Sequence, residues 1–145
     1  MNILFVCTGN TCRSAMAAAL FNKITVERGI DVRIESAGLF ATDGEPASGE
    51  AIIAMKKYDI DLLGHHAQSI NTELLEKSDL ILTMTAAHKM VLEQSAPGKT
   101  YTLCEYAGAE YDIDDPYGGD VTEYEECAEE IYHALLKVAD RIENN

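Results

Sequence analysis

A cysteine, an arginine and a serine lie close together in the segment CTGNTCRS, residues 7–14. The apolar run ILFV precedes this segment and AMAAALF follows it, so we expect a buried strand, a turn and the start of a helix. A thiolate is a strong nucleophile, and the planar guanidinium of arginine can hold two oxygens of one anion. The segment therefore predicts a site that holds an oxyanion against a nucleophilic sulfur.

The backbone of this turn suits a tetrahedral anion. Its N–H groups can surround one anion, and the amino end of the following helix adds a partial positive charge. We expect positive φ angles at Gly9 and Asn10, because these residue types adopt them most easily. Cys7 is the predicted nucleophile, Arg13 the anion clamp and Ser14 a hydrogen-bond donor to the sulfur. The residues expected to bind the anion are Thr8, Gly9, Asn10, Thr11, Cys12, Arg13 and Ser14.

Two plainer interpretations compete with this one. An isolated cysteine at the end of a strand is commonly a small buried residue, and Gly-Asn is commonly a simple turn. A nucleotide-binding P-loop also holds phosphate, but its pattern requires Gly-x4-Gly-Lys-Ser/Thr, and residues 7–14 contain no lysine. Because Cys-x5-Arg-Ser occurs here at a strand-to-helix turn, we favour the catalytic interpretation.

A general acid is expected in the segment DIDDPYGGD, residues 112–120, because the group that leaves phosphorus needs a proton. Proline fixes the backbone beside the preceding aspartate, and Gly-Gly permits a tight return. A solvated turn in an acidic protein is the plainer alternative. We predict Asp115 as the acid, Tyr117 as an aromatic wall of the site, and Asp114 as a neighbour or alternative acid.

Short β-rich runs alternate with helical patterns along the chain. Strands are expected at residues 3–7, 32–36, 79–84 and 100–103, and helices at 13–28, 51–58, 73–77, 87–94 and 121–142. Gly29 should end the first helix, and the second should bury Ile52 and Met55, with Ile53 as a further candidate. This alternation predicts a parallel sheet, in which ligands bind at the carboxyl ends of the strands. Both candidate loops follow strands and should meet there.

Composition limits the classes of function. A chain of 145 residues with 47% hydrophobic content predicts one domain over residues 1–145. The net charge of −14 argues against nucleic acid and anionic membranes as partners. No apolar run approaches the ~20 residues of a membrane span and no signal peptide is apparent, so we expect a cytoplasmic protein. The four cysteines form neither a zinc pattern nor a disulfide scaffold.

The chain resembles the low-molecular-weight protein phosphatase family over essentially its whole length. The resemblance rests on VCTGNTCRS near the start, SAG at 36–38, SDLILTMT at 78–85 and DDPYGG at 114–119, in the family's order and spacing. It implies a four-stranded parallel sheet in the order 2-1-3-4 with helices on both faces and the phosphate loop after strand 1. It also implies hydrolysis of phosphorylated protein substrates through a phosphocysteine, without metal or other cofactor, with inorganic phosphate or similar oxyanions as ligands.

The resemblance also implies individual roles. Cys7 corresponds to the nucleophile, Arg13 to the phosphate clamp, Ser14 to the thiolate donor, Asn10 to the loop-shaping residue and Asp115 to the general acid. Ser36 and His65 fall where the family has a hydrogen-bonded network behind the loop, with His66 as the alternative histidine. The chain departs from many relatives at Ala15, where they have proline, at Gln68, where they have arginine, and at Gly118, where they have a second aromatic residue.

The substrate branch is indicated by Thr11, where tyrosine-directed relatives usually have a larger aliphatic residue. This threonine and the Asp-Pro-Tyr-Gly-Gly segment resemble a bacterial branch that acts on phosphoarginine in proteins, although a threonine in a loop is often only a local hydrogen bonder. We therefore predict a protein-arginine phosphatase, with protein-tyrosine phosphatase as the alternative.

Two other classes are less well supported. An arsenate reductase of this fold needs further cysteines near the third strand, and residues 78–95 contain none. A phosphocysteine carrier needs neither the arginine clamp nor a distant acid. The curl of the loop should also bring Cys12 near Cys7, so mild oxidation is predicted to join these two residues in a disulfide.

Overall fold

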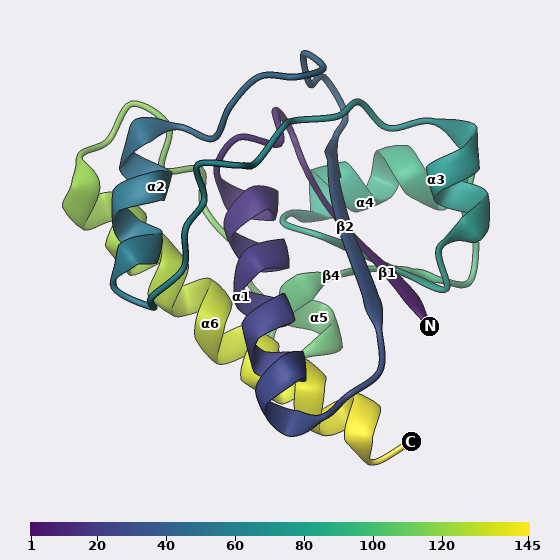
Figure 1. The fold of residues 1–145 in the computed structure, drawn as a ribbon. Coiled ribbons are helices and arrows are strands. Elements are labelled where there is room, and N and C mark those ends of the chain that lie inside the picture. Colours follow the sequence, from purple (N-terminus) through teal and green to yellow (C-terminus); the bar gives the residue numbers. More distant parts are fainter.

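The sheet is parallel and lies between two layers of helices (Figure 1). The computed structural model describes residues 1–145. The strands are β1 (Asn2–Cys7), β2 (Arg33–Gly38), β3 (Leu80–Thr83) and β4 (Thr100–Thr102), in the spatial order β2-β1-β3-β4. The predicted strand order is thus confirmed. The helices are α1 (Arg13–Arg28), α2 (Gly49–Lys56), α3 (Thr72–Lys77), α4 (Ala86–Glu93), α5 (Leu103–Tyr106) and α6 (Val121–Glu143).

Alternate residues of β1 enter two different cores. Ile3, Phe5 and Cys7 belong to the larger core, which is formed with α1, α2, α5 and α6. Leu4 and Val6 face the smaller core, which is formed with α3 and α4. Every residue of β1 after Asn2 is buried, as the continuous apolar run predicts for a strand covered on both faces. This alternation places the Cys7 side chain on the α1 face of the sheet.

The helix boundaries follow local signals. Gly29 ends α1 in a left-handed conformation with φ 68°, as predicted. In α2, Met55 is buried and Ile52 is partly buried against the core, but Ile53 is 50% exposed, so the inward placement of Ile53 is wrong. Helix α5, in which Thr102 and Glu105 form a capping box, was not predicted.

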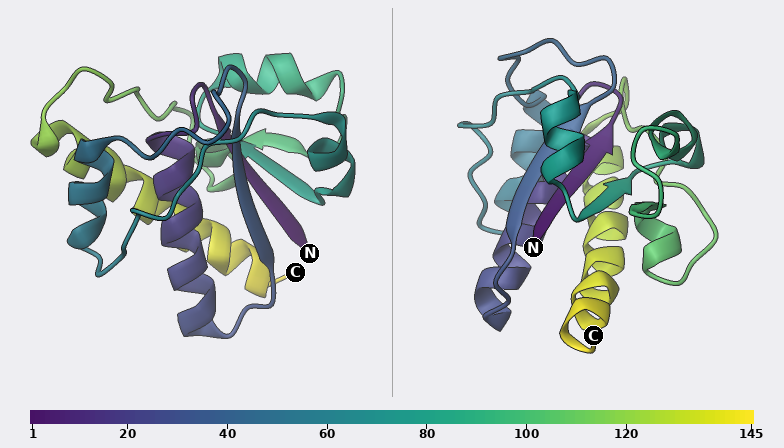
Figure 2. Two further views of the ribbon diagram at one scale, coloured as in Figure 1. Left: turned by 45° about the horizontal axis from the view of Figure 1, so that its top comes forward. Right: turned by 90° about the vertical axis from the view of Figure 1, so that its right-hand side faces the viewer.

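The loops that follow the strands gather at one edge of the sheet (Figure 2). At this edge the end of β1 leads into α1, and the segment between α5 and α6 returns toward the start of α1. The longest helix, α6, packs along α1 and α2. None of the helices combines the length and the apolar character that crossing a bilayer requires.

Candidate active site

The phosphate loop, residues 7–14, is held from one side by the end of β2 and the turn that follows it. The backbone N–H of Leu39 donates to the carbonyl of Cys7 at 3.0 Å, and that of Phe40 donates to the carbonyl of Thr8 at 2.9 Å. A Cβ on Gly38 would lie 2.6 Å from the Thr8 carbonyl oxygen. Glycine is therefore required at position 38 for this close approach of two backbones.

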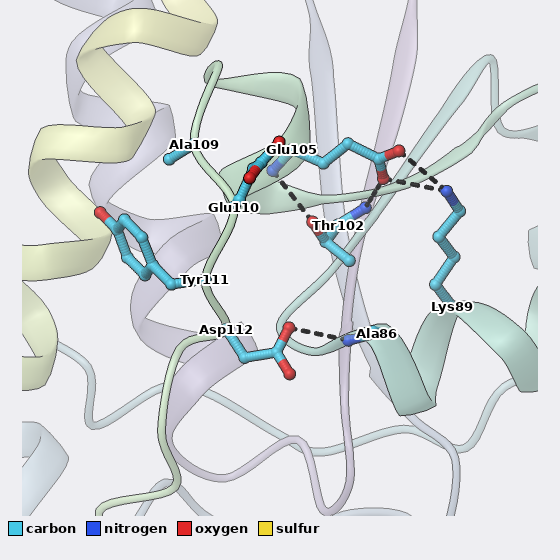
Figure 3. A pocket seen from close by; sticks show the side chains of 8 residues that line it. All are labelled: Ala86, Lys89, Thr102, Glu105, Ala109, Glu110, Tyr111 and Asp112. Atoms are coloured by element: carbon cyan, nitrogen blue, oxygen red, sulfur yellow. Dashed lines mark hydrogen bonds and ion pairs between the residues drawn. The ribbon is translucent and has the colours of Figure 1, made fainter.

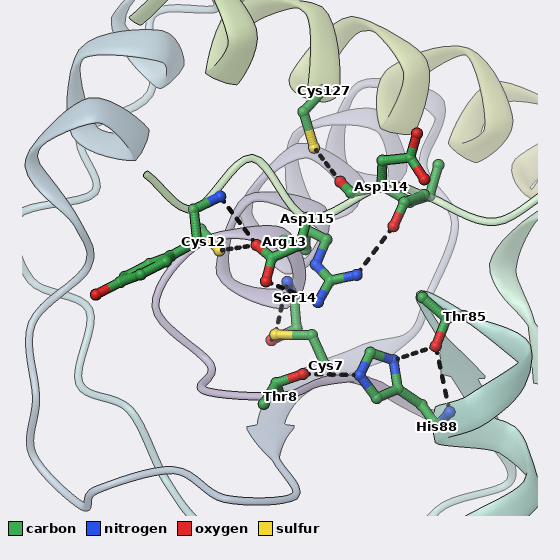
Figure 4. Close-up of polar contacts among 12 residues, drawn as sticks. Cys7, Thr8, Cys12, Arg13, Ser14, Thr85, His88, Asp114, Asp115 and Cys127 are labelled. Carbon is green, nitrogen blue, oxygen red and sulfur yellow. Dashed lines mark hydrogen bonds and ion pairs between the residues drawn. The ribbon is translucent and has the colours of Figure 1, made fainter. Parts of the chain in front are cut away.

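The sulfur of Cys7 is buried and receives hydrogen bonds from Ser14. The Ser14 Oγ lies 2.8 Å from Cys7 Sγ, and the Ser14 backbone N–H donates to the same sulfur at 3.4 Å (Figure 4). The side-chain amide of Asn10 donates to Ser14 Oγ at 2.8 Å, which leaves the serine proton for the sulfur. Donors aligned in this way stabilise a thiolate.

Asn10 shapes the loop from within. It is fully buried and has a φ of 56°, whereas Gly9 does not have a positive φ, so that part of the prediction is wrong. The Asn10 carbonyl accepts from His65 Nε2 at 2.7 Å, and its side-chain oxygen accepts from the Gln68 backbone N–H at 3.0 Å. Ser36 contributes its backbone carbonyl, which accepts from the Gln68 side chain at 2.9 Å. The loop is thus supported by the segment after α2, with Gln68 in place of the arginine of many relatives.

One donor of Arg13 has no hydrogen-bond partner in the protein. Its side chain is 4% exposed, and Nη1 donates to the carbonyl of Ile113 at 2.9 Å. Nη2 lies 3.6 Å from Asp115 Oδ2, but Nε is buried and has no partner. A buried donor without an acceptor is costly, and an oxyanion bound in the loop would supply one.

The two adjacent aspartates face different surroundings. Asp115 approaches the phosphate loop, since its carboxylate lies 3.6 Å from Arg13 and 3.9 Å from Cys12 Sγ. It also accepts from the backbone N–H of Tyr117 at 3.0 Å, and its side chain is 49% exposed. The backbone carbonyl of Asp114 accepts from the Cys127 thiol instead. Burial raises the pKa of Glu130 on α6, and the negative charge of the Asp114 carboxylate raises it further. Asp115 is therefore the aspartate placed to exchange protons with a bound group.

Cys12 lies beside the carboxylate of Asp115, with its Sγ 3.9 Å from Asp115 Oδ1. Burial raises its pKa to about 11, and the nearby charge of Cys7 adds to this effect. All four cysteines are free thiols. Because its pKa is about 11, the Cys12 thiol is protonated at neutral pH.

A cleft of about 370 Å³ adjoins the phosphate loop at Thr11. Tyr117, Gly118 and Gly119 form its wall from the acid loop, which we define as residues 107–120. Two carboxylates, Glu45 and Glu50, stand among its other lining residues. These two glutamates were not predicted as site residues, because neither lies near a recognisable motif.

A larger cavity of about 510 Å³ lies at the start of the acid loop (Figure 3). Its lysine is already paired, since Lys89 Nζ lies 2.9 Å from the carboxylate of Glu105. The carboxylate of Asp112 accepts from the Ala86 backbone N–H at 2.9 Å. None of the phosphate-loop residues lines this cavity.

Comparisons with known proteins agree with this geometry. The family described as "Low molecular weight phosphotyrosine protein phosphatase" matches residues 2–145. The protein-arginine-phosphatase of Bacillus subtilis (strain 168) is 38% identical, and the match covers 100% of this chain and 99% of that protein. The low molecular weight protein-tyrosine-phosphatase PtpB of Staphylococcus haemolyticus (strain JCSC1435) is also 38% identical, with 95% of this chain and 97% of that protein covered.

A solved structure shares the fold over the whole length of this chain. It is described as "YwlE arginine phosphatase - C7S mutant with phosphorylated active site serine", and its TM-score is 0.96 at 37% identity. The match covers 100% of this chain and 97% of that one. With its fold, its phosphate loop and its sequence in agreement, the chain belongs to the low molecular weight phosphotyrosine protein phosphatase family.

Proposed function

We propose that this chain removes phosphoryl groups from arginine side chains of proteins, and that residues 1–145 act as one phosphatase domain. As a member of its family the chain is a cysteine-dependent phosphatase. The observation that carries the arginine assignment is the cleft beside Thr11, which the acidic residues Glu45 and Glu50 help to line. The relatives named arginine phosphatases support the same substrate.

The first step forms a phosphocysteine. Cys7 Sγ attacks phosphorus, and an S–P bond forms as the P–N bond to the guanidine breaks. The buried guanidinium of Arg13, whose Nε has no protein partner, stabilises the charge on the phosphoryl oxygens. Asp115 gives its proton to the departing nitrogen, which leaves as part of a neutral or cationic guanidine group.

The second step releases phosphate. Asp115, now ionised, takes a proton from a water molecule that attacks phosphorus. Its carboxylate is half exposed, so water can reach it. The S–P bond breaks and the sulfur leaves as a thiolate, which the hydroxyl and backbone N–H of Ser14 stabilise.

Substrate choice should depend on the walls of the cleft, because the same acid can protonate either a guanidine nitrogen or a phenolate oxygen. A phosphoarginine side chain carries several N–H donors, whereas a phosphotyrosine ring is apolar. The Thr11 hydroxyl and the two glutamates offer acceptors for such donors. Gly118 adds no side chain to the wall, so the acceptors stay open to the substrate.

The experiment compares kcat/KM for two peptides that differ only in phosphoarginine or phosphotyrosine. We expect the native protein to prefer phosphoarginine, and Thr11→Ile to shift the ratio toward phosphotyrosine by roughly ten- to a hundredfold, since one hydrogen bond to a charged group is lost. The double change Glu45→Gln, Glu50→Gln should shift the ratio in the same direction. Glu27→Gln, an exposed carboxylate on α1, is the control.

Protein-tyrosine phosphatase is the second candidate. The ring of Tyr117 is 82% exposed beside the cleft, where it could pack against a phenol ring. Relatives with this activity in their names match the chain at similar identity. A native preference for phosphotyrosine that Thr11→Ile leaves unaltered would establish this alternative.

A further inference from the structure

His88 is a buried residue of α4 that has no part in the two chemical steps. Its Nε2 lies 2.9 Å from the Thr8 hydroxyl oxygen, and its Nδ1 lies 3.0 Å from the Thr85 hydroxyl oxygen (Figure 4). Thr8 belongs to the phosphate loop, and Thr85 caps the amino end of α4. The ring therefore connects the phosphate loop to the helix that follows β3.

The direction of these hydrogen bonds follows from the cap. Thr85 Oγ1 accepts from the His88 backbone N–H at 3.2 Å, and its single proton can be donated to Nδ1. Burial lowers the pKa of His88, and the positive charge of Arg13 lowers it further, so the ring carries one proton at neutral pH. With that proton on Nε2, the ring donates to Thr8 and leaves the Thr8 hydroxyl proton free.

We propose that His88 is a positioning residue, which fixes Thr8 so that the threonine hydroxyl donates to an oxygen of the anion bound in the phosphate loop. This inference depends on the proposed function in one respect only, namely that the phosphate loop binds an oxyanion. The Thr8 side chain is exposed at the mouth of the loop, and its backbone carbonyl is already held by Phe40.

Helix α4 thereby supports the phosphate loop and the acid loop together. The charged groups that face the ring are Arg13 from α1, and Asp112 and Asp115 from the acid loop. Asp112 accepts from the backbone N–H of Ala86, at the first turn of the same helix. A shift of α4 would therefore move both parts of the site.

A double-mutant cycle tests the contact between the two side chains, with sulfate as the probe. Thr8→Val and His88→Phe should each raise the sulfate dissociation constant about five- to tenfold, the effect of one hydrogen bond. The double variant should bind sulfate no more weakly than either single variant, because both changes remove the same contact. His88→Gln, which keeps a donor, should restore part of the affinity. We also expect the losses to appear in KM more than in kcat.

The control is Thr25→Val at the opposite end of α1, where the buried hydroxyl donates to the carbonyl of Phe21. It should lower the melting temperature and leave sulfate binding unchanged. Sulfate affinity within twofold of native in Thr8→Val, or additive losses in the double variant, would overturn the proposal. If His88→Phe does not fold, the sulfate affinities of Thr8→Val and His88→Gln still test the proposal. Sulfate binding does not depend on the phosphorylated residue, so a phosphotyrosine preference would refute only the arginine assignment.

Discussion

The phosphate loop and the acid loop supply the two halves of the proposed chemistry, but they are built in opposite ways. In the phosphate loop Asn10 and Ser14 are fully buried, and Arg13 is 4% exposed. The acid loop has no helix or strand after α5, and its Tyr117 is 82% exposed. The anion-binding half is thus preformed inside the protein, whereas the proton-transferring half stays open to substrate and water.

The contacts that anchor the two loops show the same difference. The phosphate loop is hydrogen-bonded to the turn that follows β2, to His65 and to Gln68. The acid loop is fixed mainly before its aspartate, where the backbone of Ile113 pairs with Met84 and with Arg13. We therefore expect changes to the phosphate loop, other than at Cys7 itself, to affect anion binding and stability, and changes in the acid loop to affect kcat.

The largest expected effect separates binding from chemistry within the phosphate loop. Cys7→Ser should abolish turnover, because a serine hydroxyl is a much weaker nucleophile than a thiolate. The backbone cradle and Arg13 remain, so phosphate or vanadate should still bind. Steady-state kinetics and calorimetric titration of phosphate measure the two properties. Substantial residual turnover would show that Cys7 is not the nucleophile.

In the acid loop, Asp115→Asn should lower kcat roughly 10²–10⁴-fold, the usual contribution of a positioned acid or base. Phosphate affinity should change little, because the phosphate loop is intact. The matched control is Asp114→Asn, in which the removed carboxylate belongs to the neighbouring residue on the α6 side. A larger loss of kcat in Asp114→Asn than in Asp115→Asn would reassign the acid.

A smaller effect is expected where β2 supports the phosphate loop. The Cβ added by Gly38→Ala would lie 2.6 Å from the Thr8 carbonyl oxygen and 3.0 Å from the Asn10 nitrogen. We expect a loss of about 1–3 kcal/mol in the free energy of unfolding, as for other overpacked sites, together with weaker phosphate binding. Gly49→Ala, whose Cβ would meet nothing within 4 Å, is the control. Equal melting temperatures for the two variants would show that the loop tolerates displacement.

The smallest expected effect is reversible and concerns Cys12. Peroxide should oxidise Cys7 to a sulfenic acid, and Cys12 should then form a disulfide with it. This capture requires the Cys12 thiolate, and its pKa of about 11 means that the thiolate fraction rises about tenfold per pH unit up to that value. Intact-mass measurements over time should show faster loss of two hydrogens at higher pH, reversed by added thiol. Cys104→Ser should behave like the native protein, and disulfide formation that is independent of pH would contradict the mechanism.

Most of the fold was predictable because its signals are local. Apolar runs mark β1 and β3, alternation marks β2 and the short segment TYTL marks β4, and the predicted first helix has the observed bounds Arg13–Arg28. Helix α5 was missed because four residues give no periodicity, although its Thr-x-x-Glu capping box is visible in the sequence. Ile53 was misplaced because α2 lies at the surface and buries only part of its apolar residues.

The site was predictable where one segment carries it. Residues 7–14 contain the proposed nucleophile and anion clamp together with the observed donors to the Cys7 sulfur, so their spacing alone indicates an anion site. His88 could not be found in this way, because its partner Thr8 is 80 residues away along the chain. The cleft carboxylates Glu45 and Glu50 reach Thr11 only through the fold, since the Ser48 N–H donates to the Thr11 carbonyl.

The central position of β1 has a consequence for the order of folding. Ile3 pairs with Ile34 on one side and with Leu80 on the other, so the strand that ends in Cys7 is complete only after distant parts of the chain have come together. Pairings of such long sequence separation form slowly, and the acid loop lies later still in the chain. Recovery of phosphatase activity after dilution from denaturant should therefore report formation of the whole sheet, with no active fragment preceding it.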